Sequence, residues 1–153
     1  MEKIFENFTI SILKLNKLVN KIKAYEMKEY GLKAVHVMCV YYLSENPQGL
    51  KFSELVKLTL EDKAAVSRAL TLLYGKGYVN YDRNKYNADI NLTQEGLKVA
   101  AFIEEKSVAA VEAGSAVLRE EERILFYKSL NTIAENLSLY YKNLKNEKNV
   151  NIK

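Results

Sequence analysis

The chain is poor in the residues on which several common functions depend. Its 153 residues include one cysteine, one histidine, one proline and no tryptophan. A single cysteine, Cys39, excludes an internal disulfide and is typical of a reducing compartment. A single histidine, His36, offers no convincing nucleophile–base pair, and the sequence has no glycine-rich phosphate loop. The sequence therefore argues against an enzyme, and no cofactor is expected.

Long apolar runs are lacking as well. No stretch approaches the roughly 20 apolar residues that a membrane-spanning helix needs. The first residues, 1–5, lack the apolar run of a secretory signal, so we expect a cytoplasmic protein. The composition is that of a soluble globular domain, with 23 basic and 19 acidic residues and a net charge of +4. This mild basic excess is compatible with a polyanionic partner but does not require one.

His36 and Cys39 lie three residues apart, which would place both on one face of a helix. That spacing permits metal ligation, but the chain contains no second histidine or cysteine to complete a site. Structural roles are the better interpretation, and no metal is expected. Because the surrounding segment is apolar, Cys39 is predicted to be buried and unreactive.

Apolar periodicity predicts a mainly helical chain. Apolar residues at three- and four-residue steps indicate a first amphipathic helix: Ile4, Phe8, Ile12, Leu15, Val19 and Ile22. The segment 33–44 is apolar on nearly all sides and predicts a central, buried helix. Two further helices are expected, one capped by Thr93 and running to about residue 113 and one over 120–143, with a bend at Gly114-Ser115. The tail, 146–153, is predicted to be disordered.

The middle of the chain predicts a winged helix-turn-helix. A short helix over 54–58, capped by Ser53, is followed by a helix over 61–74. Two alternating segments, 78–82 and 88–92, then predict strands around the polar loop 83–87. The expected fold is therefore mainly α with a small β-hairpin wing.

The helix over 61–74 has two contrasting faces. Val66, Ala69, Leu70 and Leu73 share one face at 100° per residue and are expected to pack on the helix over 33–44. The opposite face carries small, hydroxyl and cationic side chains: Ala64, Ser67, Arg68 and Thr71. Small residues permit close approach to base edges, hydroxyls can bond bases or phosphates, and arginine can bridge guanine O6 and N7. This face is predicted to be the DNA-reading surface.

Several motifs together resemble the MarR family of transcriptional regulators. They are Gly31-Leu32-Lys33-Ala34, Ser53-Glu54-Leu55-Val56, the run from Asp62 to Leu70, Gly77-Tyr78-Val79, Leu92-Thr93-Gln94-Glu95-Gly96 and the run from Leu118 to Arg123. The resemblance implies a winged DNA-binding domain over 31–93 and a helical dimerisation region formed by 1–30 and 94–145. It also implies a homodimeric regulator, often a repressor released by a small molecule, that binds a pseudo-palindrome in double-stranded DNA.

The candidate DNA-binding residues follow from the helix faces and from this resemblance: Ser53, Lys63, Ala64, Ser67, Arg68, Thr71, Arg83 and Lys85. Lys63 is expected to meet phosphate rather than bases. The family's wing is usually longer and carries an Asp-Arg-Arg-like run near its tip, whereas this hairpin offers only Asp82-Arg83 and Lys85. Arg83 and Lys85 are predicted to reach phosphates or a minor groove, unless the hairpin tip is merely solvated.

Two questions stay open at the level of the sequence. Among the 11 tyrosines, Tyr25, Tyr41 and Tyr42 fall near the expected seam between the dimerisation helices and the winged domain. Tyrosine suits a pocket for an aromatic or amphipathic effector, although core packing explains these residues equally well. The alternative function is a winged helix used for protein–protein contact, which a gel shift on genomic fragments would distinguish from a DNA-binding regulator.

Overall fold

The computed structural model describes residues 3–4 and 6–150, with side-chain surroundings given up to residue 146. The chain forms two compact units, one ending at Ala110 and the other beginning at Val111. Most of the secondary structure is helical, with one small antiparallel sheet. The expected mainly α fold with a β-hairpin is confirmed.

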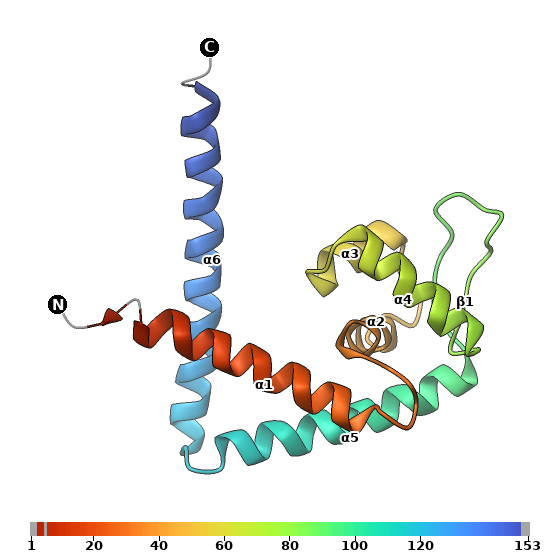
Figure 1. The fold of residues 1–153 in the computed structure, drawn as a ribbon, viewed down its shortest axis with the longest axis horizontal. Helices are drawn as coiled ribbons and strands as arrows, with labels where there is room; N and C mark the ends of the chain where they lie inside the picture. Colours follow the sequence, from red (N-terminus) through yellow and green to blue (C-terminus); the bar gives the residue numbers. More distant parts are fainter. Residues whose placement is uncertain (1–2, 5, 151–153) are drawn as a thin grey trace. The chain divides into compact units, whose positions relative to one another are not determined.

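The first unit contains most of the elements (Figure 1). In chain order they are a π-helix η1 (Glu6–Ile10), α1 (Ser11–Glu26), α2 (Ala34–Ser44), α3 (Phe52–Thr59), α4 (Lys63–Gly75), β1 (Val79–Asn80), β2 (Asn91–Leu92) and α5 (Gln94–Ser115). The last residues of α5 belong to the second unit, which also holds α6 (Glu120–Val150).

Helix α2 is the centre of the first unit, as its all-round apolarity predicts. Five of its 11 residues are buried: His36, Val37, Cys39, Val40 and Leu43. It contacts α3 and α4 as well as α1, and Figure 1 shows it end-on between these helices. A helix packed against three others in this way gains most of its stability from the burial of apolar side chains.

The helix boundaries follow local chain chemistry. Gly31, in the turn after α1, has φ +65°, which glycine adopts without strain. Asp62 caps α4, because its Oδ1 accepts a 2.7 Å bond from the Ala65 N–H. The expected cap at Ser53 is wrong: Lys51 is the extended residue before α3, and Glu54 reaches back to accept from its N–H at 2.7 Å. Ser53 therefore lies inside the first turn of α3.

The wing is a short hairpin. Val79 pairs with Leu92 and Asn80 with Asn91, so the strands are shorter than the expected 78–82 and 88–92. An isolated bridge joins Leu50 to Ile90 and ties the hairpin to the segment before α3. Beyond the strands, a loop over 81–90 projects from the end of the sheet near α4 (Figure 1).

The second unit consists mainly of α6. This helix continues to Val150, past the expected end near residue 143. Residues 146–150 of the tail that was predicted to be disordered are thus helical, and 151–153 lie outside the described residues. The exposed apolar side chains of α6 include Ile124, Leu125, Ile133 and Leu137. Within the described residues, the helices are too short or too polar to cross a membrane.

Candidate nucleic-acid interface

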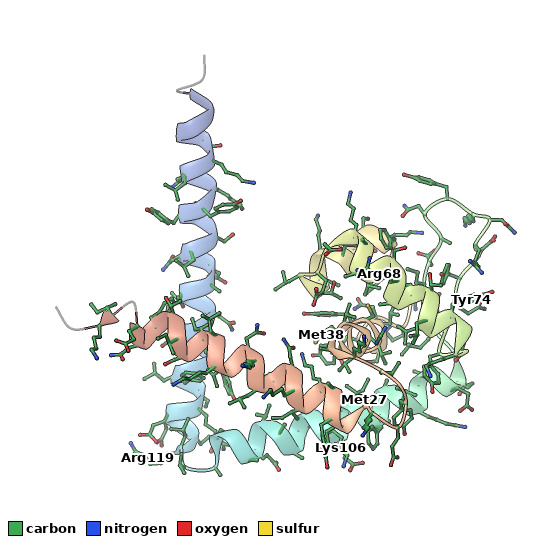
Figure 2. All side chains as sticks on the ribbon, viewed as in Figure 1. Met27, Met38, Arg68, Tyr74, Lys106 and Arg119 are labelled. Carbon is green, nitrogen blue, oxygen red and sulfur yellow. The ribbon has the colours of Figure 1, made fainter. Side chains whose placement is uncertain are left out.

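Helix α4 presents the two faces that its sequence predicts. Val66, Ala69, Leu70 and Leu73 are its buried residues, and the helix contacts α2 more extensively than any other element does. Lys63, Ala64, Ser67, Arg68 and Thr71 are all exposed. Figure 2 labels Arg68 on this helix. The burial of the first face on α2 therefore fixes which side chains α4 turns to solvent.

The polar side chains on this exposed face differ in whether they already make hydrogen bonds within the protein. The Thr71 hydroxyl donates a 3.0 Å bond to the Ser67 carbonyl, which leaves the hydroxyl oxygen as an acceptor. Arg68 makes no side-chain hydrogen bond or ion pair within the described part of the chain. Its guanidinium is therefore free to form the bidentate bond that guanine accepts.

A shallow groove joins α4 to the hairpin. It has a volume of about 230 Å³, and the residues lining it come from the start of α3, from α4 and from the wing. The polar and charged ones are Ser67, Thr71, Tyr81, Asp82, Arg83, Lys85 and Asn87. The structure thus brings four predicted DNA-binding residues to one concave surface. Ser53, Lys63, Ala64 and Arg68 are exposed outside that lining.

Aromatic packing holds the base of the hairpin to the end of α4. The rings of Tyr74 and Tyr81 meet edge to face with centroids 5.1 Å apart. The Arg83 guanidinium carbon lies 5.3 Å from the centroid of the Tyr74 ring, within cation–π range. Arg83 is therefore drawn towards α4 rather than towards the hairpin tip. Sequence reasoning missed Tyr74 and Tyr81 in this role, because a tyrosine at a helix end gives no sign of its partner.

A second attachment lies on the other side of the hairpin. Lys51, just before α3, forms a 2.7 Å ion pair with Asp89 near the start of β2. This hydrogen bond from Lys51 lowers the pKa of Asp89. Asp89 is solvent-exposed, so the pair contributes little free energy and serves to orient the loop.

The cations of this surface form no close ion pairs within the described part of the chain. Lys63, Arg68, Arg83 and Lys85 have no carboxylate within ion-pair distance among the described residues. The nearby acids are engaged in local bonds: Asp62 caps α4, and the Asp82 Oδ1 accepts a 2.9 Å bond from the Asn84 N–H. Four cations without a close carboxylate partner, around one helix and one hairpin, are available to the phosphates of a polyanion.

The three tyrosines considered for an effector lie on two helices, α1 and α2. Tyr41 and Tyr42 meet edge to face with ring centroids 5.3 Å apart. Tyr25, on α1, is 80% exposed. The two cavities described for this unit are lined by other residues.

His36 and Cys39 occupy the core. The Nδ1 of His36 accepts a 2.7 Å bond from the Lys33 N–H, and burial together with Lys33 and Lys76 lowers the pKa of the ring. Burial raises the pKa of the Cys39 thiol to about 12, as expected for an unreactive cysteine. The described residues bring no three His, Cys, Asp or Glu side chains together as metal ligands.

Helices α2 to α4 followed by the β1–β2 hairpin form a winged helix-turn-helix. No protein-family model and no curated protein matches the sequence. Among solved structures, a MarR protein from Peptoclostridium difficile is 23% identical, covers 94% of this chain and 95% of its own, and has a TM-score of 0.82. The transcriptional regulator SlyA is 20% identical over 89% and 97%, with a TM-score of 0.78. MepR of S. aureus, solved in complex with DNA, is 17% identical over 85% and 97%, with a TM-score of 0.76. The fold is that of the MarR family of winged-helix regulators.

Proposed function

We propose that this protein is a sequence-specific DNA-binding transcriptional regulator that acts as a homodimer and represses from a pseudo-palindromic operator. The observation that carries the proposal is the surface around α4. Its exposed face and the hairpin flank one groove, and the four cations there lack carboxylate partners in the described chain. The similarity to MepR, which was solved with DNA, supports the same reading.

The residues divide by the chemistry of their exposed groups. Arg68 is proposed to read a guanine in the major groove, while Ser67, Thr71 and Ala64 approach neighbouring base edges. The hydroxyl proton of Thr71 is engaged by the Ser67 carbonyl, so its methyl group is proposed to contact a thymine methyl. Cations and hydroxyls at the edge of the surface are proposed to position the helix by phosphate contacts: Ser53, Lys63, Arg83 and Lys85.

The homodimer is proposed from apolar surface that each unit leaves uncovered. None of the α1 residues is buried, and Ile12, Leu15, Val19 and Ile22 are all exposed on it. Helix α6 exposes a second apolar set in the other unit. Contiguous apolar surface of this kind marks an interaction site. A second copy of the chain is the occupant that would also give two DNA-reading helices.

Catalysis forms no part of the proposal. The only thiol is buried with a strongly raised pKa, and the only imidazole is buried with its Nδ1 already accepting a bond from Lys33. Neither group is available to a substrate in solution.

Release by a small aromatic effector is the regulatory part of the proposal. The edge-to-face pair Tyr41–Tyr42 lies on α2 and Tyr25 lies on α1. A ligand bound between these two helices would change the angle at which the winged domain is held relative to α1. A thermal-shift screen of phenolic compounds, followed by operator titration with each hit, tests this point. Hits that stabilise the protein without changing operator affinity would refute the switch.

The experiment that tests DNA binding is selection from a random pool of duplexes, with each selected sequence then titrated in a gel shift at several salt concentrations. A regulator enriches a defined motif and binds it more tightly than scrambled duplex, and the affinity falls steeply with salt. A protein–protein interaction module would enrich no motif, and that result would overturn the proposal.

A further inference from the structure

A partly buried lysine lies where α1 meets α2. The lysines that precede it on α1 are exposed, whereas Lys23 is partly buried. Its Nζ lies 3.0 Å from the sulfur of Met38, which Figure 2 labels on α2. Among the described residues, no carboxylate lies within ion-pair distance of Lys23. An ammonium group that is partly removed from water and rests on a thioether costs free energy unless a negative charge acts on it from further away.

That negative charge belongs to Glu61, in the turn between α3 and α4. Burial lowers the pKa of Lys23, and the charge of Glu61 acts in the opposite direction. The same carboxylate adds to the effect of burial in raising the pKa of the Cys39 thiol. Lys23 lies on α1 and Cys39 on α2. Two groups on different helices thus place Glu61 near the contact between Lys23 and Met38.

Glu61 differs from the acid that follows it. The Asp62 Oδ1 accepts a 2.7 Å bond from the Ala65 N–H, so the amide groups of α4 compensate part of its charge. Glu61 is exposed, and its carboxylate forms no ion pair within the described part of the chain. The N-terminal residues of a recognition helix are the ones that meet base edges. A carboxylate at that end of α4 would be brought close to the duplex, whose phosphates it repels.

We infer that Lys23 is a positioning residue for DNA binding, which offsets the negative charge of Glu61 from α1 and so lets the N-terminal end of α4 approach the duplex. The inference rests on the proposed function. Lys23 acts through Glu61 rather than by its own contact with DNA. Its removal should therefore weaken DNA binding only while residue 61 carries a negative charge.

A double-mutant cycle on the selected duplex, with the full-length protein throughout, tests this coupling. Lys23→Met removes the charge and keeps a flexible apolar side chain against Met38. This substitution is expected to weaken DNA binding about three- to tenfold in the wild-type protein. In the Glu61→Gln protein it is expected to change the affinity by less than about twofold. The difference between the two backgrounds should shrink as salt is raised, because salt screens the charges.

Three further measurements separate this role from a structural one. Lys23→Met is expected to be at least as stable as wild type in urea unfolding, because it removes a partly desolvated charge. Lys23→Arg keeps the charge and is expected to keep the wild-type affinity. Lys21→Met removes the same charge from an exposed position on α1 and is also expected to bind DNA as wild type does.

The inference is overturned, while DNA binding stands, if Lys23→Met leaves the affinity unchanged or weakens the Glu61→Gln protein as much as wild type. An equal loss for Lys21→Met would show that Lys23 contributes only general positive charge. A loss of stability and affinity that Glu61→Gln does not relieve would show a structural role, and either result overturns the inference. If wild-type protein enriches no duplex at all, the proposed function fails and the inference fails with it.

Discussion

At the scale of single residues, Arg68 is the most informative side chain for DNA recognition. It is exposed on α4 and has no hydrogen-bonding or ionic partner among the described residues. Arg68→Ala is expected to cost about 1–3 kcal/mol on the selected site and to relax the preference at one base pair, because a bidentate contact is lost. Gel-shift titrations against duplexes varied at that pair measure both effects.

The matched control for this variant is Arg119→Ala. Arg119 pairs with Glu122 at 3.3 Å and belongs to the second unit, so its removal changes net charge by the same amount outside the unit that contains α4. Operator affinity is expected to stay at the wild-type value. If Arg68→Ala instead weakens binding equally on every sequence, Arg68 contacts phosphate and another residue reads the base.

His36 should make the stability of the winged domain depend on pH. Burial, Lys33 and Lys76 lower its pKa, so the folded protein favours the neutral ring while the unfolded chain titrates near its ordinary value of about 6.5. The unfolded state therefore binds more protons as the pH falls through that value, and the free energy of unfolding decreases. Urea unfolding between about pH 7.5 and 5 is expected to show this decrease.

His36→Gln is the comparison for that measurement. A glutamine at the third position of α2 can still accept from the Lys33 N–H, as His36 Nδ1 does at 2.7 Å, but it does not titrate. The variant is expected to have a flatter pH profile than wild type, even if its stability at pH 7.5 is lower. Parallel profiles for the two proteins would show that other groups cause the pH dependence.

At the scale of elements, periodicity predicted the helices better than it predicted their ends and the hairpin. The four buried residues of α4, the first of which is Val66 and the last Leu73, follow directly from a 100° repeat. Helix α2 was identified by its all-round apolarity. The start of α3 was misplaced because Glu54 bonds the Lys51 backbone, a choice between competing caps that spacing does not decide. The stacking of Arg83 on Tyr74 depends on tertiary placement of the hairpin, which local patterns do not contain.

Gly96, near the start of α5, tests how closely the hairpin packs against this helix. A Cβ on Gly96 would overlap the Tyr78 carbonyl oxygen, and backbone cannot move aside cheaply. Gly96→Ala is therefore expected to lower the free energy of unfolding by about 1–3 kcal/mol or more. Urea unfolding at one fixed protein concentration measures the change, since a dimer's stability depends on concentration.

Gly114 is the internal control for that substitution. A Cβ there meets no heavy atom of the described residues within 4 Å. Gly114→Ala is expected to raise the stability by up to about 1 kcal/mol, because alanine is the better helix former. A Gly96→Ala protein as stable as wild type would mean that β1 can shift away from α5.

At the scale of the whole molecule, both units leave many apolar side chains exposed to solvent. Val19 on α1 is 46% exposed, within a stripe that continues through Ile22. Val19→Glu places a charge on that stripe and is expected to shift the protein from dimer towards the 17.5 kDa monomer at micromolar concentration. Light scattering gives the mass directly.

Asn20→Glu adds the same charge one residue further along α1, where the exposed Asn20 side chain donates a 3.3 Å bond to Asn16. This variant is expected to remain dimeric. Two dimeric variants would exclude the Val19 face from the interface, and a monomeric wild-type protein would contradict the proposed dimer itself.

A symmetric dimer constrains the DNA as well as the protein. Two α4 helices related by a two-fold axis can enter major grooves on the same side of the duplex only when the half-sites are about 34 Å apart, one helical turn. Inserting about 5 base pairs between the half-sites turns one of them to the opposite side, whereas about 10 base pairs restore the side but not the distance. Gel shifts are expected to show strong loss of affinity for the first insertion. Equal binding to the selected duplex and to the half-turn insertion would show that each winged domain binds its half-site independently.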